Sequence, residues 1–136
     1  MRKLALVFFA SLAVSTLAWT QPSNDDCTNP IVIQNVFNFC SAVGAYTNVG
    51  ATPSTYGPAT CYASTQNDVW FAFTPQATDV NITVTGAAAQ APGGTLQDPQ
   101  VALYFGTCGG TINQLGCESA TGNNNIVEIY EGGLFV

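Results

Sequence analysis

Short runs in which apolar and polar residues alternate fill the sequence after residue 20, and they constrain the fold more than any other feature. Residues 80–85 show this most clearly, because Val, Ile and Val alternate there with Asn, Thr and Thr. In a β-strand, successive side chains point to opposite faces, so a hydrophobic pattern that repeats every two residues makes one face apolar and the other polar. A helix would require a repeat near 3.6 residues. Glycine, proline, asparagine and threonine separate the runs. The pattern therefore predicts an all-β fold.

Further runs with the composition of strands follow at a spacing of roughly ten residues. Residues 69–73 are aromatic and apolar on both faces, as expected of a strand that is buried on both sides. The other expected strands are 101–105 and 126–130, with 31–34 and 46–49 as weaker ones. Loops are expected at 52–58, 86–99 and 121–125, where Pro, Gly and Asn are concentrated. This spacing predicts an antiparallel β-sandwich with a jelly-roll-like arrangement.

The N-terminal segment is predicted to be a secretory signal peptide, residues 1–20, with cleavage near residues 18–21. Arg2 and Lys3 precede an apolar stretch from Leu4 to Ala18, and small residues follow at positions that suit signal peptidase. The apolar stretch is too short to span a bilayer comfortably, which disfavours an uncleaved anchor. We therefore expect a protein that is secreted or held at the cell surface after export by the general secretory pathway, with residues 23–136 as one β-sandwich module.

Charge excludes two classes of partner. Arg2 and Lys3 are the only cationic residues of the chain, which has no histidine, so its 8 Asp and Glu side chains face no cation once the signal peptide is removed. Nucleic-acid binding depends on Lys and Arg that neutralise phosphates. Anionic membrane surfaces attract basic segments for the same reason. We expect no nucleic-acid partner and no membrane insertion after signal cleavage.

All five cysteines follow the signal peptide, and in an exported chain they are expected to form disulfides. Cys108 and Cys117 bracket eight residues that suit a hairpin loop, and they are the predicted pair. The pairing of Cys27, Cys40 and Cys61 stays open, with one thiol left over from the odd count.

The sequence offers few side chains that could act in catalysis. Without histidine, and without lysine in the exported part, neither a Ser–His–acid triad nor an activated cysteine can be built. A carboxylate pair remains, and Asp68 and Asp98 each stand just before an apolar strand. Aspartates at such places usually accept hydrogen bonds from backbone amides. We therefore predict no catalytic residue and no enzymatic activity.

Two weaker kinds of site remain as expectations. Asp25, Asp26, Asp68 and Asp98 are the candidate calcium ligands, although no EF-hand spacing is present; no other cofactor is expected. For ligand binding, Tyr56 and Tyr62 lie in a region rich in Pro, Gly and Thr, and exposed aromatic rings there would suit glycans. Trp70 lies inside an apolar run and is expected in the core.

The last residues are expected to begin another strand. Residues 126–130 are followed by Glu131-Gly132-Gly133 and then by Leu134-Phe135-Val136, where the sequence stops. A strand that is cut short leaves an unpaired edge. Either the module continues past this point, or another segment or chain completes the edge.

Several segments together resemble the pre-peptidase C-terminal-like β-sandwich modules of secreted and cell-surface multidomain proteins of Bacteroidota. They are Asn-Asp-Asp-Cys at 24–27, Val-Gly-Ala-Thr at 49–52, Asp-Val-Trp-Phe-Ala-Phe at 68–73 and Val-Ala-Leu-Tyr-Phe-Gly-Thr-Cys-Gly-Gly at 101–110, with Cys117 nine residues after Cys108. The resemblance implies a jelly-roll-like module that accompanies adhesins and peptidases, often exported by type IX secretion. Family members usually continue with a further strand, Gly-x-x-Tyr-x-x-x-Val, so the resemblance also implies that this chain is an N-terminal fragment.

The sequence thus favours a non-catalytic accessory or adhesion module of a larger extracellular protein. Its partners would be the other domains of that protein and, through weak binding, an extracellular glycan or protein. The alternative is a structural subunit that assembles when a neighbouring chain completes its edge strand.

Overall fold

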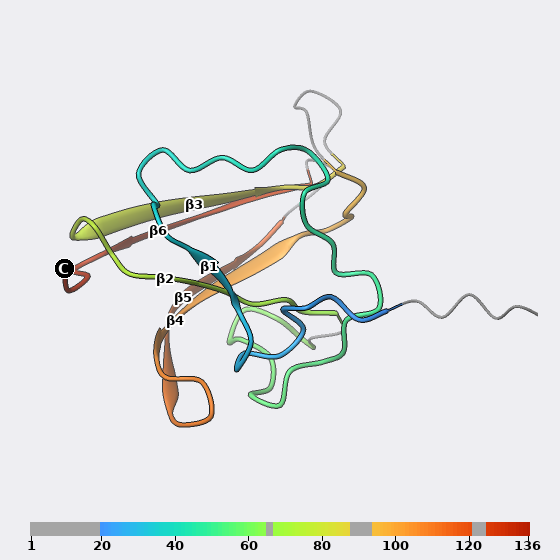
Figure 1. Ribbon diagram of the computed structural model, residues 1–136, viewed down its shortest axis with the longest axis horizontal. Coiled ribbons are helices and arrows are strands. Elements are labelled where there is room, and N and C mark those ends of the chain that lie inside the picture. The colour runs from blue at the N-terminus through green and yellow to red at the C-terminus, as the bar shows by residue number, and fades with distance from the viewer. Residues whose placement is uncertain (1–19, 65–66, 88–93, 121–124) are drawn as a thin grey trace, which may run out of the picture.

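The computed structural model describes residues 20–64, 67–87, 94–120 and 125–136, and the strands within these ranges pair two by two (Figure 1). The strands are β1 (Ile31–Ile33), β2 (Phe71–Phe73), β3 (Asp79–Thr85), β4 (Gln100–Gly106), β5 (Ile112–Ser119) and β6 (Ile126–Gly132). They are the regular elements of the described ranges, so the predicted all-β class is confirmed. The predicted signal peptide falls on residues 1–19, outside the described ranges, apart from residue 20. A search of the described residues finds no helix that is long and apolar enough to cross a membrane.

β3 and β6 form an antiparallel pair that carries much of the core. Ile82 is paired with Ile129 and Val84 with Val127, and the two β6 residues are buried. The alternating residues of β3, Asn81 among them, face solvent. The alternation over residues 80–85 therefore has the expected cause, an apolar face turned inward and a polar face turned outward.

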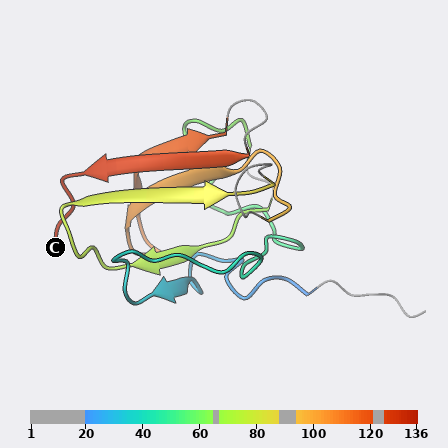
Figure 2. The ribbon, with the colours of Figure 1, turned by 90° about the horizontal axis from the view of Figure 1, so that it is seen from above.

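β4 and β5 form a second antiparallel pair that lies across from β3 and β6 (Figures 1 and 2). The register shifts between Leu103 and Tyr104, as in a β-bulge. Leu103 is buried, and its partner Gly116 lies against the side chain of Ile129 in β6. A Cβ atom at Gly116 would be only 3.1 Å from Ile129 Cδ1, so glycine lets the two sheets approach here. The two pairs are the layers of a small sandwich.

β1 and β2 form a parallel pair, which differs from the expected antiparallel arrangement. The connection between them runs from residue 34 to residue 70, long enough for the chain to cross over and return in the same direction. Ile31 N donates to Trp70 O at 3.1 Å, and Trp70 N donates to Asn24 O at 2.8 Å. In the view from above, the β1–β2 pair is drawn on the side of β3 that faces away from β6 (Figure 2).

The prediction of a weak strand at residues 46–49 is wrong. Turn hydrogen bonds from Ala45 N to Ala42 O and from Ala51 N to Asn48 O bend the backbone there. Tyr46 packs edge-on against Phe71, with ring centroids 4.8 Å apart. The residues that looked like a strand are therefore part of the long β1–β2 connection.

Two further expectations concerned the later part of the chain. Residues 109–116 were expected to be a loop, but β5 begins at Ile112. Residues 134–136 were expected to begin a strand and do not, because Gly133, with φ of 76°, turns the backbone after β6. Leu134 N still donates to Thr78 O at 2.8 Å, which holds this segment beside the start of β3.

Candidate interaction surface

The disulfides join segments that are far apart in the sequence. Cys27 is bonded to Cys108 and Cys61 to Cys117, with Cα–Cα distances of 5.5 and 6.1 Å. The predicted Cys108–Cys117 pair is therefore wrong. The residues between these two cysteines are a turn and an extended strand, and a strand advances about 3.3 Å per residue. Cys117 is consequently carried away from Cys108, beyond the distance that a disulfide can bridge.

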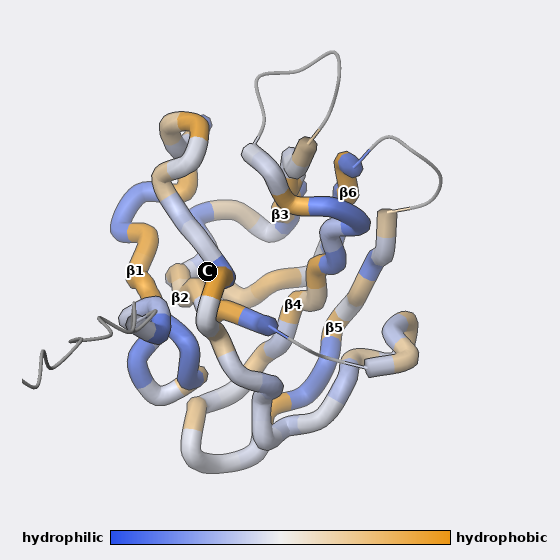
Figure 3. Tube along the Cα trace, turned by 90° about the vertical axis from the view of Figure 1, so that its right-hand side faces the viewer, coloured by the Kyte–Doolittle hydropathy of each residue, from blue (hydrophilic) through white to orange (hydrophobic). Residues whose placement is uncertain are grey.

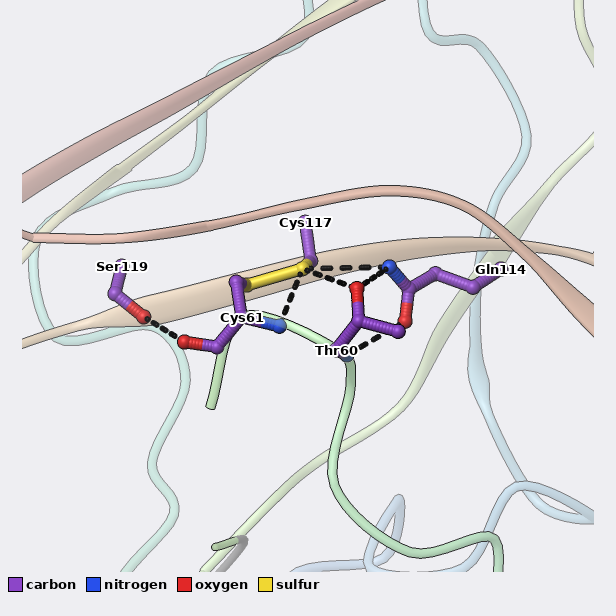
Figure 4. The surroundings of a disulfide bond; sticks show 5 residues. All are labelled: Thr60, Cys61, Gln114, Cys117 and Ser119. Atoms are coloured by element: carbon purple, nitrogen blue, oxygen red, sulfur yellow. Dashed lines mark hydrogen bonds between the residues drawn. A yellow bond between two sulfur atoms is a disulfide. The ribbon is translucent and has the colours of Figure 1, made fainter. Parts of the chain in front are cut away.

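The Cys61–Cys117 disulfide fastens the 60–62 segment to β5 (Figure 4). Thr60 N donates to Gln114 Oε1 at 2.9 Å, and Gln114 Nε2 donates back to Thr60 Oγ1 at 2.7 Å. Ser119 Oγ lies 3.5 Å from Cys61 O on the other side of the bond. Two disulfides indicate that the chain folds in an oxidising compartment. Among the described cysteines, Cys40 is the unpaired one, and it is exposed.

The candidate calcium ligands serve instead as hydrogen-bond acceptors for the backbone. Asp25 accepts from Thr52 N at 2.6 Å, and Asp68 accepts from Ser54 N at 2.7 Å, so two carboxylates hold the 52–54 segment. Asp26 accepts from Thr28 N at 3.0 Å in a local turn. For Asp68, this is the backbone role expected from the sequence.

Asp98 does not join this group. It stands in the left-handed region with φ of 46°, and its amide donates to Asn125 Oδ1 at 2.8 Å. Within the described ranges, no three His, Cys, Asp or Glu side chains are grouped as metal ligands would be. The four aspartates therefore do not form one shared metal site. Asp68 and Asp98 also do not form a catalytic pair, because they belong to different loops.

The candidate glycan-binding tyrosines are packed side chains rather than free platforms. Tyr56 lies edge-on to Trp70 at 5.8 Å between ring centroids, and Trp70 lies 5.7 Å from Tyr104. The Tyr56 hydroxyl accepts a hydrogen bond of 2.6 Å from Gly109 N. Tyr56 and Tyr62 are both half-buried. The expectation that these two rings are exposed is therefore wrong, because the aromatic residues pack against one another.

The environment of Tyr62 keeps its hydroxyl protonated. Burial raises the pKa of Tyr62 well above the ordinary tyrosine value, and the neighbouring Tyr104 and Asp68 raise it further. Burial, followed by Asp68, also raises the pKa of Tyr104. The folded protein thus stabilises neutral tyrosines in this cluster.

We expect the free energy of unfolding to fall as the pH rises above the ordinary tyrosine pKa of 10.0. The unfolded chain loses the Tyr62 proton there, whereas the folded protein keeps it, so this contribution is complete below pH 10.0 and is lost toward the higher folded-state pKa. Urea unfolding between about pH 8 and pH 11 measures how steeply the free energy of unfolding falls with pH. All proteins in the experiment carry Cys40→Ser, which prevents thiol–disulfide exchange. Tyr62→Phe should flatten the slope, and an unchanged slope would contradict the assignment.

A groove opens between the end of β2 and the start of β3. Its volume is about 170 Å³, comparable with a cavity that holds a benzene ring. We call it the β3 groove; it is lined by residues 36–38, Phe73, residues 75–77, residues 79–81 of β3 and Leu134. A second hollow, beside Asp25 and Trp70, is smaller, with about 70 Å³.

One large apolar side chain that lines the β3 groove is strongly exposed. Phe37, one of its lining residues, is 71 % exposed. Other large apolar side chains exposed in the β1–β2 region are Val32, Phe39, Val43, Tyr46, Val49 and Phe71. Figure 3 shows the hydrophobic residues of β1 at the outside of the fold. Of these, Phe37 is the one that lines the groove, and an exposed aromatic side chain at a groove is a candidate contact for a partner.

Phe37 and Phe39 were not among the residues predicted from the sequence to bind a ligand. The signal for them was available, because Val36-Phe37-Asn38-Phe39 places aromatic residues between two expected strands, where a plain loop would be polar.

Asp79 is the carboxylate that lines the β3 groove, and Glu128 stands on the neighbouring strand β6. Tyr130 donates from its hydroxyl to Asp79 Oδ1 at 3.2 Å, and this hydrogen bond raises the pKa of Tyr130. Asn81 Nδ2 donates to Glu128 Oε1 at 2.6 Å on the same face of the sheet. No lysine, arginine or histidine occurs among the described residues, so these carboxylates face no protein cation.

Comparisons with known proteins identify no relative of this chain. No family model matches the chain, and neither a curated protein nor a solved structure shows significant similarity to it.

Proposed function

We propose that this protein is a non-catalytic extracellular module that binds another protein through the β3 groove and the apolar side chains around it. The observation that carries the proposal is the exposure of Phe37 beside a groove large enough for an aromatic or aliphatic side chain. Large apolar side chains that are exposed at a groove are often the contacts of a binding partner.

Two features support an extracellular and non-catalytic role. The Cys27–Cys108 and Cys61–Cys117 bonds suit a secreted protein or the surface of a cell. Of the two carboxylates considered for catalysis, Asp68 accepts a hydrogen bond from Ser54 N, whereas Asp98 stands in a different loop, where its amide donates to Asn125. The resemblance to accessory modules of larger secreted proteins agrees with this proposal, in which the partner is a neighbouring domain or a separate extracellular protein.

Protein binding is favoured over glycan binding because of the aromatic geometry. Glycan sites use open aromatic faces together with polar groups. Tyr56 and Tyr62 are half-buried, and the Tyr56 hydroxyl is already hydrogen-bonded to Gly109. Phe37 and Phe39 are exposed but offer no polar atom for sugar hydroxyls.

Site-specific photo-cross-linking tests the proposal on the exported protein in its producing cells. A benzophenone amino acid at position 37 is expected to give discrete protein adducts, and the same group at position 115 is the control. Leu115 is also apolar and exposed, but it lies on β5. We expect the adducts at position 37 to exceed those at position 115 by about tenfold, as for a contact buried in a specific interface. Equal labelling at both positions, or saturable binding to one glycan that Tyr56→Ala abolishes, would contradict the proposal.

The alternative function is a structural subunit that assembles by strand complementation, and the free edge of β3 favours it. In the described residues, β6 is the only strand hydrogen-bonded to β3. Light scattering of the purified protein over a wide concentration range separates the two functions. The proposed module stays monomeric, whereas the structural subunit forms defined oligomers or fibres.

A further inference from the structure

We propose that the β3 groove receives an extended basic segment, which adds to the free edge of β3 as a strand, places apolar side chains in the groove and sets lysine or arginine beside Asp79 and Glu128. This inference rests on the proposed function and names the partner of the same surface.

The backbone of β3 offers hydrogen-bonding groups on the side away from β6. Gly86 N donates to Asn125 O at 2.7 Å, which continues the register of the β3–β6 pair. Residues of an antiparallel pair alternate between bonding to the partner strand and pointing away from it. Counting back from Gly86, the even-numbered residues of β3 bond to β6. The N–H and C=O groups of Asp79, Asn81 and Thr83 therefore point to the free edge.

Two of these three residues, Asp79 and Asn81, also line the β3 groove. A strand added at this edge would bond to their backbone groups, and every second side chain would point inward. The space for an inward side chain is the groove, about 170 Å³, lined by apolar residues such as Phe37 and Leu134. Main-chain bonds with alternate side chains in pockets are how extended peptides join a sheet edge.

Charge identifies the partner as basic. The outward side chains of an added strand would stand beside Asp79 on β3, with Glu128 one strand further away on β6, and no cation of the described chain neutralises these carboxylates. A second copy would bring more carboxylates to this edge, because the chain after residue 3 contains no lysine, arginine or histidine. Like charges brought together oppose association, and opposite charges favour it.

The probe is a nine-residue peptide, Lys-Val-Lys-Val-Lys-Phe-Lys-Val-Lys, tested by fluorescence anisotropy against the full oxidised protein. We expect saturable binding, with a Kd at least about tenfold higher for the peptide in which glutamate replaces every lysine. Phe37→Ser should raise the Kd by about tenfold, and Leu115→Ser, the matched exposed apolar control, should not change it. Asp79→Asn should raise the Kd by a smaller factor that vanishes at high salt.

Hydrogen exchange of the protein amides tests strand addition directly. The bound peptide is expected to slow exchange at Asp79, Asn81 and Thr83, while Val80, Ile82 and Val84, already bonded to β6, stay unchanged. N-methylation of alternate peptide amides should abolish binding in one alternate set and spare it in the other, because only one set faces β3.

The inference is overturned if both methylated sets bind equally, if the glutamate peptide binds as well as the lysine peptide, or if the protein associates with itself more tightly than with the peptide. If cross-linking at position 37 succeeds while the peptide tests fail, the surface binds protein in another way and the proposed function stands. If cross-linking also fails, both are wrong.

Discussion

Replacing Cys27 and Cys108 together with alanine is expected to lower the free energy of unfolding by about 4 kcal/mol. The bond closes a long loop, since the two cysteines are separated by 81 residues in the sequence. In the chain-entropy model, opening a loop of that size returns about 4.5 kcal/mol of conformational freedom to the unfolded chain. Because small domains are stabilised by only about 5–15 kcal/mol, a large part of the protein should then be unfolded at 37 °C. Urea unfolding monitored by tryptophan fluorescence measures the effect.

Cys40→Ser is the matched control, because Cys40 is exposed and unpaired among the described cysteines. It should change stability by less than about 0.5 kcal/mol, as surface substitutions usually do. Mass spectrometry of non-reduced peptides checks the connectivity itself. Trypsin is of no use after residue 3, where the chain has no lysine or arginine, so cleavage must be at acidic or aromatic residues. A peptide that links Cys108 to Cys117, or a Cys40→Ser variant as unstable as the double variant, would contradict the structure.

The second large effect is expected from Ile129→Ala, at about 3 kcal/mol of lost stability. Ile129 is 3 % exposed, is paired with Ile82 and lies against Gly116 of the opposite sheet. Truncation removes apolar contacts from both layers and leaves a cavity between them, which typically costs about 2–5 kcal/mol. Urea unfolding of the oxidised protein gives the difference from the unmodified chain.

Ile126→Ala in the same strand is the control for this substitution. Ile126 is 39 % exposed, so the same chemical change removes fewer buried contacts and should cost less than about 1 kcal/mol. Equal losses from the two variants would mean that β6 does not turn its odd-numbered residues inward, and the assigned sandwich packing would then be wrong.

Local pattern was enough to predict the longer strands. Residues 80–85, 101–105 and 126–130 were placed within one or two residues of β3, β4 and β6, because strict alternation reports which side chains are buried. The short β2 was also found, although it occupies only three of the five expected residues. Residues 46–49 were mistaken for a strand, since a tyrosine and a valine separated by polar residues look alike in a strand and in a turn.

The candidate sites were less predictable, because each depends on distances between remote segments. Tyr56 and Tyr62 appeared exposed by composition, yet both are half-buried, and Tyr56 packs edge-on against Trp70. Asp25 and Asp68 could be recognised as acceptors for backbone amides, but not as the pair that holds residues 52–54. The β3 groove is formed by three separate segments, residues 36–38, residues 73–81 and Leu134, and no local pattern reports such a convergence.

The sequence by itself determined the all-β class, the places of the longer strands β3, β4 and β6, the absence of Lys, Arg and His after residue 3 and the odd number of cysteines. These properties follow from composition and from the period of two, which are local. Only the tertiary structure decided the disulfide partners, the parallel pairing of β1 with β2 and the free edge of β3 beside an apolar groove. Those depend on how the chain returns on itself, and contacts between residues more than 50 positions apart leave no trace in a local pattern.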